Sequence, residues 1–207
     1  MEIKICLSGA TGNVGREIVK ELDKQPNRDL LVTAAVGRRH CGRILSDVLP
    51  KPAPDAHIFN DVPTAHAASP FDVLVDYTTP DSVFQTIMEA IELGVHCVIG
   101  TSGLVDAQYA EISSAAEAKG IGVFAAGNFS ITAALMTHFS QLATQFVPSW
   151  EIFDYGSDTK IDAPSGTARE LAYLLSQKGK PDYRYTPAEI RGIAESRGAS
   201  LNDSQVH

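Results

Sequence analysis

Short, almost entirely apolar runs alternate with helix-like patterns along the first 127 residues of the chain. The apolar runs predict strands at 3–7, 30–36, 57–59, 71–77, 95–99 and 122–126. Between them, apolar residues at helical spacing predict a helix at 13–22. Helices are also expected at 80–92, which Pro80 and Asp81 open and Gly94 stops, and at 106–119, which Gly120 ends. Strands that are apolar on both faces are typical of parallel sheets covered by helices on both sides. The alternation therefore predicts an α/β fold with a parallel sheet.

The pattern changes after residue 127. Helices are expected at 131–146 and 166–177, and strands at 151–155 and 189–196, which together indicate a smaller α+β domain. We therefore expect one domain at 1–127 and a second at 128–207. We expect the second domain to be incomplete at its C-terminus, because no closing element follows the final "SLNDSQVH".

Composition excludes several classes of protein. The chain has 207 residues and a net charge of -8, so we expect no binding to nucleic acid. No apolar run approaches the ~20 residues that a membrane helix needs, and the first residues lead directly into a strand, so we expect no membrane segment and no signal peptide. Cys6, Cys41 and Cys97 are far apart, so we expect no disulfide, no metal site and a cytoplasmic location.

A glycine-rich turn, "SGATGNVGR", joins the first expected strand to the first expected helix. Glycines let the backbone approach a pyrophosphate closely, and a helix N-terminus offers free N–H groups and the positive end of a dipole. The alternative is a tight turn without a ligand. The cofactor-binding residues expected here are Gly9, Thr11, Gly12, Asn13, Val14 and Gly15.

The end of the second strand bears on which dinucleotide binds. An acidic residue there would bind the ribose hydroxyls of NAD, but this chain has Gly37, Arg38 and Arg39. Two guanidinium groups favour a 2′-phosphate. We therefore expect NADPH to be preferred, with NADH possible. The alternative is a solvated arginine pair on a loop.

Three further strand ends carry residues suited to a cofactor cleft, in "DYTTP", "IGTSGL" and "AAGNFS". In open parallel sheets, ligands bind outside the carboxyl ends of the strands. Ordinary turn chemistry is the alternative for each segment taken singly. The cofactor-binding residues expected here are Tyr77, Thr78, Gly100, Thr101, Ser102, Ala126, Asn128 and Phe129.

These segments, together with "KIDAPSGTA" at 160–168, match the motifs of one known family in order and spacing. The chain therefore resembles the 4-hydroxy-tetrahydrodipicolinate reductase (dihydrodipicolinate reductase) family. The resemblance covers essentially the whole chain, and "KIDAPSGTA" is its most specific part. It implies a Rossmann-type cofactor domain followed by a mixed α+β domain. It also implies a homotetramer, or another homo-oligomer, assembled through the second domain.

The resemblance further implies an oxidoreductase of lysine and diaminopimelate biosynthesis. Such an enzyme delivers hydride from NAD(P)H to a cyclic unsaturated dicarboxylate and forms tetrahydrodipicolinate. Lys160 is expected to bind a substrate carboxylate, and Ser165, Gly166 and Thr167 to cradle it at a helix start. The alternative is that Thr167 and Glu170 form a capping box, which would leave Lys160 unexplained.

One departure from the family concerns the proton donor. Family members carry a histidine pair shortly before the lysine, and here those positions hold Gly156 and Ser157. Lys160 is our candidate catalytic residue, with Tyr155, Asp158 and an ordered water as alternatives. A missing general acid costs ~10²–10⁴-fold in rate, so the change bears on rate or substrate identity more than on reaction class.

Two other functions stay open at this point. One is a reductase of the same fold that acts on a different imine or unsaturated acid, which the missing histidines favour. The other is an NADP-binding sensor without catalysis, because "GATGNVG" also resembles the opening of atypical short-chain dehydrogenases. The catalytic members of that group use a Tyr-x-x-x-Lys pair, whereas Tyr155 and Lys160 have one residue too many between them.

Overall fold

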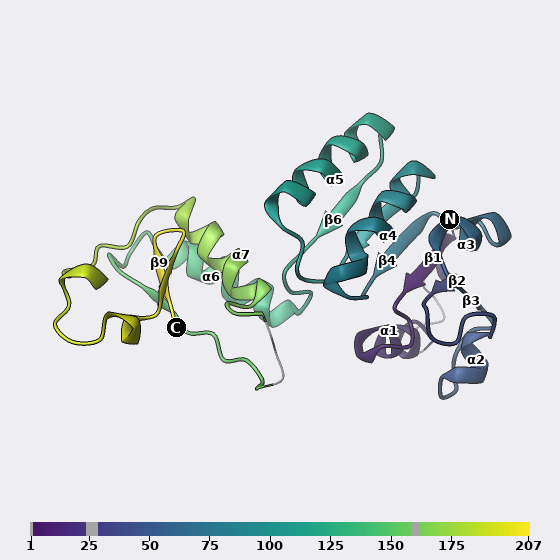
Figure 1. Ribbon diagram of the computed structural model, residues 1–207, viewed down its shortest axis with the longest axis horizontal. Helices are drawn as coiled ribbons and strands as arrows, with labels where there is room; N and C mark the ends of the chain where they lie inside the picture. The colour runs from purple at the N-terminus through teal and green to yellow at the C-terminus, as the bar shows by residue number, and fades with distance from the viewer. Residues whose placement is uncertain (1, 24–28, 159–161) are drawn as a thin grey trace. The chain divides into compact units, whose positions relative to one another are not determined.

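The chain forms two compact units, Met1–Ala126 and Gly127–His207, in a computed structural model that describes residues 2–23, 29–158 and 162–207 (Figure 1). Each unit has its own sheet and its own apolar core. No helix in the described part of the chain combines the length and the apolar character needed to cross a lipid bilayer.

The first unit is built on a six-stranded sheet in the order β3-β2-β1-β4-β5-β6, with every neighbouring pair parallel. This confirms the expected Rossmann-type α/β fold. Because the chain runs from β1 outward to β3 and then returns to β4 beside β1, the strand order reverses between β1 and β4, where such sheets bind ligands. The strands are β1 Ile3–Ser8, β2 Leu30–Val36, β3 His57–Phe59, β4 Val73–Asp76, β5 His96–Ile99 and β6 Val123–Ala125.

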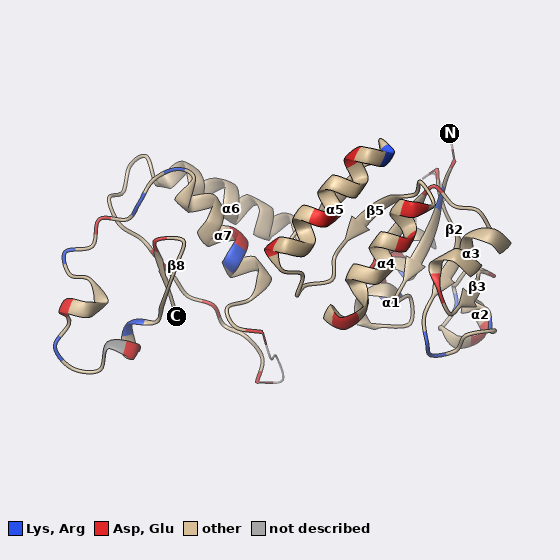
Figure 2. Cartoon of the chain, turned by 45° about the horizontal axis from the view of Figure 1, so that its top comes forward, with Lys and Arg blue, Asp and Glu red and all other residues tan. Residues whose placement is uncertain are grey.

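Helices connect these strands. They are α1 Asn13–Asp23, α2 Leu45–Val48, α3 Val62–Ala68, α4 Pro80–Glu92 and α5 Asp106–Lys119. The short helices α2 and α3 lie in a segment that the sequence analysis left irregular. A start signal for α3 is nevertheless present, because the Asp61 carboxylate accepts from Thr64 N at 2.8 Å and a proline occupies the first turn. Acidic side chains predominate on α4 and α5 (Figure 2).

Two apolar clusters form the core of the first unit. One joins β4 and β5 to α4 and α5, and includes Leu74, Ile87 and Ile99; the other surrounds Leu7 and Leu45. Adjacent residues of one strand reach different clusters because strand side chains alternate between the two faces of the sheet.

Two of the three cysteines belong to this interior. Cys6 is completely buried and Cys97 is 2% exposed, as expected for small core residues, whereas Cys41 is exposed. Burial, with a smaller contribution from the charge of Asp76, raises the pKa of both buried thiols, that of Cys97 to about 12. Both thiols therefore stay protonated and unreactive near neutral pH.

The second unit combines α6 Ile131–Ala143 and α7 Gly166–Ser176 with a three-stranded sheet of β7 Glu151–Ile152, β9 Ser204–Val206 and β8 Ala199–Leu201. Strand β9 lies in the middle, parallel to β7 and antiparallel to β8. Helix α7 packs on this sheet through Leu171 and Leu175, which contact Ile152 and Val206 in one cluster. The expected smaller α+β domain is therefore present.

The strand expected at 189–196 is wrong. The segment holds two 3-10 helices, η1 Pro187–Glu189 and η2 Ala194–Arg197. Thr186 caps the first, since both its N–H and its hydroxyl donate to the Glu189 carboxylate, at 2.9 and 2.7 Å. Proline at the first turn and glycine at positive φ after the second favour such turns over a continuous strand.

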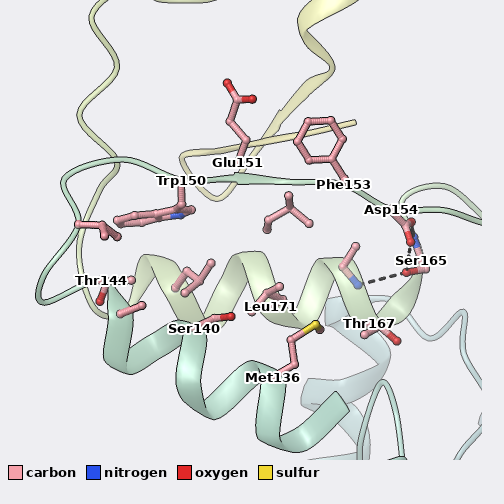
Figure 3. A pocket seen from close by; sticks show the side chains of 15 residues that line it. Met136, Ser140, Thr144, Trp150, Glu151, Phe153, Asp154, Ser165, Thr167 and Leu171 are labelled. Atoms are coloured by element: carbon pink, nitrogen blue, oxygen red, sulfur yellow. Dashed lines mark hydrogen bonds between the residues drawn. The ribbon is translucent and has the colours of Figure 1, made fainter. Parts of the chain in front are cut away.

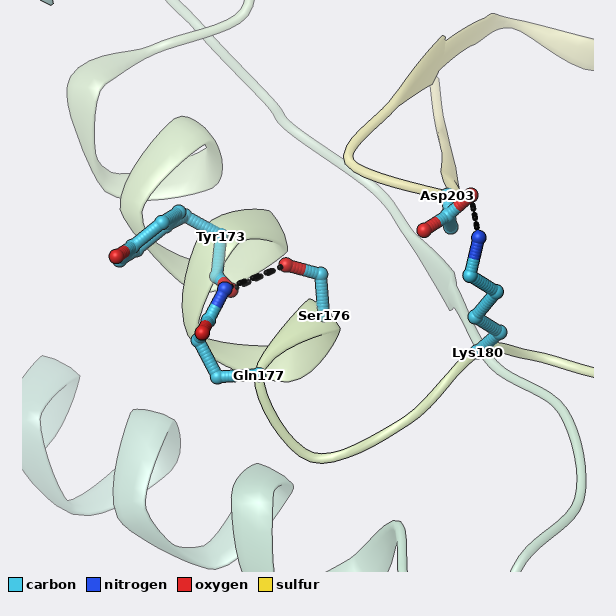
Figure 4. A network of polar contacts seen from close by, with 5 residues as sticks. All are labelled: Tyr173, Ser176, Gln177, Lys180 and Asp203. Atoms are coloured by element: carbon cyan, nitrogen blue, oxygen red, sulfur yellow. Dashed lines mark hydrogen bonds and ion pairs between the residues drawn. The ribbon is translucent and has the colours of Figure 1, made fainter.

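The end of α7 and the chain after it make local polar contacts (Figure 4). The Ser176 hydroxyl donates to Tyr173 O at 2.7 Å, and Lys180 pairs with Asp203 in the β8–β9 turn at 3.1 Å. Both charged side chains are exposed enough that the pair contributes little to stability. The expected substrate residues Ser165, Gly166 and Thr167 lie at the other end of this helix, at its start.

Candidate functional site

The expected cofactor residues of the first unit all lie where strands of its sheet end. The carboxyl ends of β2, β1, β4, β5 and β6 lie side by side, because these strands are parallel neighbours. The residues that the structure places there are Gly9 to Gly15, Arg38, Arg39, Tyr77, Thr78, Gly100, Thr101, Ser102 and Ala126. Asn128 and Phe129 follow β6 along the chain and belong to the second unit.

The glycine turn is packed so closely that only glycine fits at two of its positions. Gly9 has φ +81°, and a Cβ added there would lie 2.2 Å from Tyr77 O. A Cβ on Gly15 would lie 2.3 Å from Gly9 O and 2.7 Å from Ala10 Cα. Helix α1 begins at Asn13, directly after this turn, so its first amides have no partner within the helix. The turn therefore fits a phosphate-binding role.

The second strand end presents the two arginines on the surface. Arg38 and Arg39 are both exposed and follow Gly37, whose N–H donates to Phe59 O at 2.9 Å. This bond continues the pairing of β2 with β3 beyond the end of the strand. The guanidinium groups are thus free of the core and are long enough to reach a phosphate.

The loops after β4 and β5 are joined by a buried carboxylate that the sequence analysis missed. Asp76, the last residue of β4, is completely buried. Its carboxylate accepts from the Thr101 hydroxyl at 2.5 Å and from the Thr78 hydroxyl at 2.9 and 3.1 Å. Thr101 Oγ1 in turn accepts from Thr78 N at 2.7 Å. The only signal in the sequence is a polar residue that closes the apolar run "VLVD".

These contacts set the direction of both hydroxyl groups. Because both protons point to Asp76, Thr78 and Thr101 can offer a ligand only acceptor atoms from their side chains. The Tyr77 ring packs on Gly100, where an added Cβ would lie 2.2 Å from ring atoms. Burial raises the pKa of Tyr77, so its phenol is neutral at physiological pH. The glycine turn and these two loops thus form one connected surface.

We expect Asp76→Ala to lower the free energy of unfolding by about 2 kcal/mol, because it leaves the hydroxyl donors of Thr78 and Thr101 without their acceptor. Urea unfolding followed by circular dichroism measures this change. The exposed Asp47→Ala is the matched control and should stay within about 0.5 kcal/mol of the unchanged protein. Equal values for the two variants would contradict a structural role for the Asp76 carboxylate.

In the second unit, the expected substrate residues Ser165, Gly166 and Thr167 form the start of α7. Ser165 is the N-cap, and its Oγ accepts from Ala168 N at 3.2 Å. The Asp154 carboxylate accepts from Ser165 N at 2.6 Å and from the Ser165 hydroxyl at 2.9 Å. Both donors of Ser165 are therefore already used, and Asp154 is a positioning residue that the sequence analysis missed.

The alternative assignment of Thr167 and Glu170 to a capping box is wrong. A capping box joins the N-cap to the third helical residue, and with Ser165 as N-cap that residue is Ala168, which lacks a polar side chain. Glu170 instead accepts from Gly127 N at 2.8 Å, and Thr167 Oγ1 accepts from Asn128 Nδ2 at 3.1 Å.

A groove of about 450 Å³ runs from the start of α7 between α6, α7 and the segment around β7 (Figure 3). Asp154, Ser165 and Thr167 line one end of the groove, and Thr144 and Trp150 line the other. Met136 and Leu171 lie between these ends. The end formed by the start of α7 therefore presents the side chains of Asp154, Ser165 and Thr167 to the groove.

The candidate proton donors of residues 155–160 are placed as follows. Lys160 lies outside the described residues. Tyr155 is 93% exposed, and the Ser157 hydroxyl donates to Asp158 at 3.2 Å. Within residues 2–23, 29–158 and 162–207, no group of three or more His, Cys, Asp or Glu side chains is arranged to hold a metal ion.

Comparisons with known proteins identify chains to which this one is similar. The family model described as "Dihydrodipicolinate reductase, N-terminus" matches residues 3–129. The 4-hydroxy-tetrahydrodipicolinate reductase of Halalkalibacterium halodurans is 35% identical over 205 residues, which cover 99% of this chain and 77% of that protein. The enzyme of the same name from Bacillus cereus is 34% identical over 206 residues, with 100% and 77% covered.

Solved structures give the same picture. The dipicolinate-bound dihydrodipicolinate reductase of Paenisporosarcina sp. TG-14 superimposes with a TM-score of 0.74 and 31% identity, and covers 100% of this chain and 78% of that one. GenD2 of gentamicin A biosynthesis, solved with NAD, has a TM-score of 0.62 at 16% identity over 86% of this chain and 55% of its own, and shares the fold alone.

Proposed function

The chain belongs to the dihydrodipicolinate reductase family, and we propose that it reduces a cyclic unsaturated dicarboxylate of the dihydrodipicolinate type to tetrahydrodipicolinate. The observation that carries this proposal is the 35% identity over nearly the whole chain to a named reductase. The reaction belongs to lysine and diaminopimelate biosynthesis. We propose that the protein acts in the cytoplasm as a homotetramer or another homo-oligomer.

The close packing of the glycine turn supports the proposed cofactor site. We propose that the amides at the start of α1 hold the pyrophosphate of NADPH, and that Arg38 and Arg39 bind its 2′-phosphate. NADPH, once bound, supplies the hydride. Tyr77, Thr78, Gly100, Thr101, Ser102, Ala126, Asn128 and Phe129 are the other proposed cofactor contacts.

The start of α7 supports the proposed substrate site. Gly166 and Thr167 follow the N-cap, where unpaired amides and the positive end of the helix dipole favour a carboxylate. Because the Ser165 donors are bonded to Asp154, its contribution is to shape the turn. We propose that Lys160 supplies the positive charge and is the catalytic residue that protonates the substrate.

NADPH oxidation in a coupled assay tests the function. Dihydrodipicolinate synthase generates the unstable substrate from pyruvate and aspartate semialdehyde, and reactions without the synthase serve as the blank. We expect synthase-dependent loss of NADPH absorbance that dipicolinate inhibits. No turnover by a protein that still binds NADPH would overturn the assignment of this substrate.

Arg38→Ala should weaken NADPH binding by about tenfold and leave NADH binding within twofold, because only NADPH carries a 2′-phosphate for the guanidinium. Fluorescence titration with both nucleotides measures the two affinities. Arg43→Ala, a change of another exposed arginine on the same connecting segment, is the control. Equal losses for NADPH and NADH would show that Arg38 does not bind the 2′-phosphate.

A reductase acting on a different imine or unsaturated acid is the second candidate. Gly156 and Ser157 occupy the positions of the histidine pair that the family carries, and this is the observation that favours it. The same assay with alternative cyclic imines separates the two, since the preferred substrate is the one with the highest kcat/KM.

A further inference from the structure

Gly127 and Asn128 are bonded to the first turns of α7 by contacts that the proposed function does not require. Gly127 N donates to the Glu170 carboxylate at 2.8 Å. Asn128 Nδ2 donates to Thr167 Oγ1 at 3.1 Å, and the Thr167 hydroxyl lies 3.4 Å from Gly127 O. Two segments about 40 residues apart in sequence are thus joined by three polar contacts.

The approach of the two segments is close enough to require glycine at residue 127. A Cβ added to Gly127 would lie 2.6 Å from Glu170 Oε2 and 2.9 Å from Gly166 O. The glutamate could move, but Gly166 O belongs to the backbone of the helix start. The close approach of the two segments therefore depends on one residue from each: Gly127, which has no side chain, and Glu170, whose carboxylate accepts from the Gly127 amide.

The two joined segments carry different parts of the proposed function. Asn128 and Phe129 are proposed cofactor contacts, whereas Gly166 and Thr167 are proposed substrate contacts. We propose that Glu170 is a positioning residue that couples cofactor binding to substrate binding, an inference that rests on the proposed function. In this proposal Glu170 acts without touching either ligand, because its carboxylate holds the main chain of Gly127 against helix α7.

The coupling has a simple physical origin. A ligand that orders residues 127–129 also orders the start of α7 through the three contacts, so the second ligand loses less conformational entropy when it binds. Coupling between two sites is reciprocal, so substrate binding must strengthen cofactor binding by the same factor. The bond to Glu170 is charge-assisted, which makes it the strongest of the three contacts.

Calorimetry with dipicolinate, which the Paenisporosarcina enzyme binds, measures the coupling. The quantity is the ratio of the dipicolinate Kd without NADPH to the Kd with saturating NADPH. We expect a ratio of about five or more for the unchanged protein, and a ratio about fivefold smaller for Glu170→Ala. The Kd of each ligand alone should change by less than twofold. Glu170→Gln should keep the ratio, because its amide oxygen can still accept from Gly127 N.

A second readout is independent of both ligands. Exchange of the Gly127 amide proton, followed by NMR, should accelerate in Glu170→Ala and not in Glu170→Gln. Glu117→Ala, which changes an exposed glutamate of α5, is the control for both measurements. Thermal unfolding should be unchanged in all three variants, since the contact is exposed.

The outcomes separate the inference from the function on which it rests. An unchanged ratio in Glu170→Ala, an equal fall in Glu170→Gln, or a ratio of one in the unchanged protein would overturn the coupling role. Failure of the unchanged protein to bind either NADPH or dipicolinate would overturn the proposed function, and the inference with it.

Discussion

Gly15→Ala should weaken NADPH binding by about 100-fold while the protein stays folded. The added Cβ would lie 2.3 Å from Gly9 O and 2.7 Å from Ala10 Cα, and both atoms belong to the backbone. No change of rotamer can relieve these contacts, so the turn must open or α1 must shift. Overpacking of this kind costs typically 1–3 kcal/mol, and its upper end corresponds to about 100-fold in affinity.

Fluorescence titration with NADPH measures this loss. Gly122→Ala is the matched control, because its Cβ would meet only His96 Nδ1, at the ordinary distance of 3.4 Å, in a part of the sheet away from the glycine turn. We expect its affinity for NADPH to be unchanged. Normal NADPH binding by Gly15→Ala would show that the turn does not hold the pyrophosphate.

The fold of the first unit could be predicted from the sequence because buried parallel strands leave a simple signal. The centres of the apolar runs, such as 73–75 and 97–99, are apolar on both faces, and turn residues separate the runs from helices. Helix α3 was not predicted, because its seven residues, "VPTAHAA", are too few to show a helical period, although Asp61 and Pro63 mark its start.

The candidate site could be predicted only as far as local sequence determines it. The glycine turn and the start of α7 are contiguous segments with recognisable chemistry. Asp76 and Glu170 act on partners 25 and 43 residues away, Thr101 and Gly127, and no local pattern reports such pairs. For Glu170 the local pattern suggested a different partner, because Thr-x-x-Glu is also the signature of a capping box.

A contact between distant residues also changes the role that we assign to Ser165. Ser165 was expected to bind the substrate directly, but the structure gives both of its donors to Asp154, which ends the run "EIFD". In the proposed substrate site, Ser165 therefore serves by holding the shape of the turn. The positive charge for a substrate carboxylate is proposed to come from Lys160 in the same segment.

Lys160→Ala should lower kcat/KM by about 10²–10³-fold and leave NADPH binding within twofold. In this stretch Lys160 is the cation proposed to face a substrate carboxylate, and loss of one partner of a desolvated ion pair costs about 2–5 kcal/mol. The coupled assay gives kcat/KM, and fluorescence titration gives the NADPH affinity. Lys178→Ala, just beyond the end of α7, is the matched control and should behave as the unchanged protein.

The pH dependence of the same variant separates two roles for Lys160. If the ammonium group donates the proton, Lys160→Ala loses the alkaline limb of the kcat profile, because deprotonation of an essential acid causes that limb. If the group only binds the carboxylate, KM rises and the alkaline limb of the kcat profile remains, because another ionisable group then donates the proton. Loss of NADPH binding in Lys160→Ala would contradict both roles, because it would place the lysine at the cofactor.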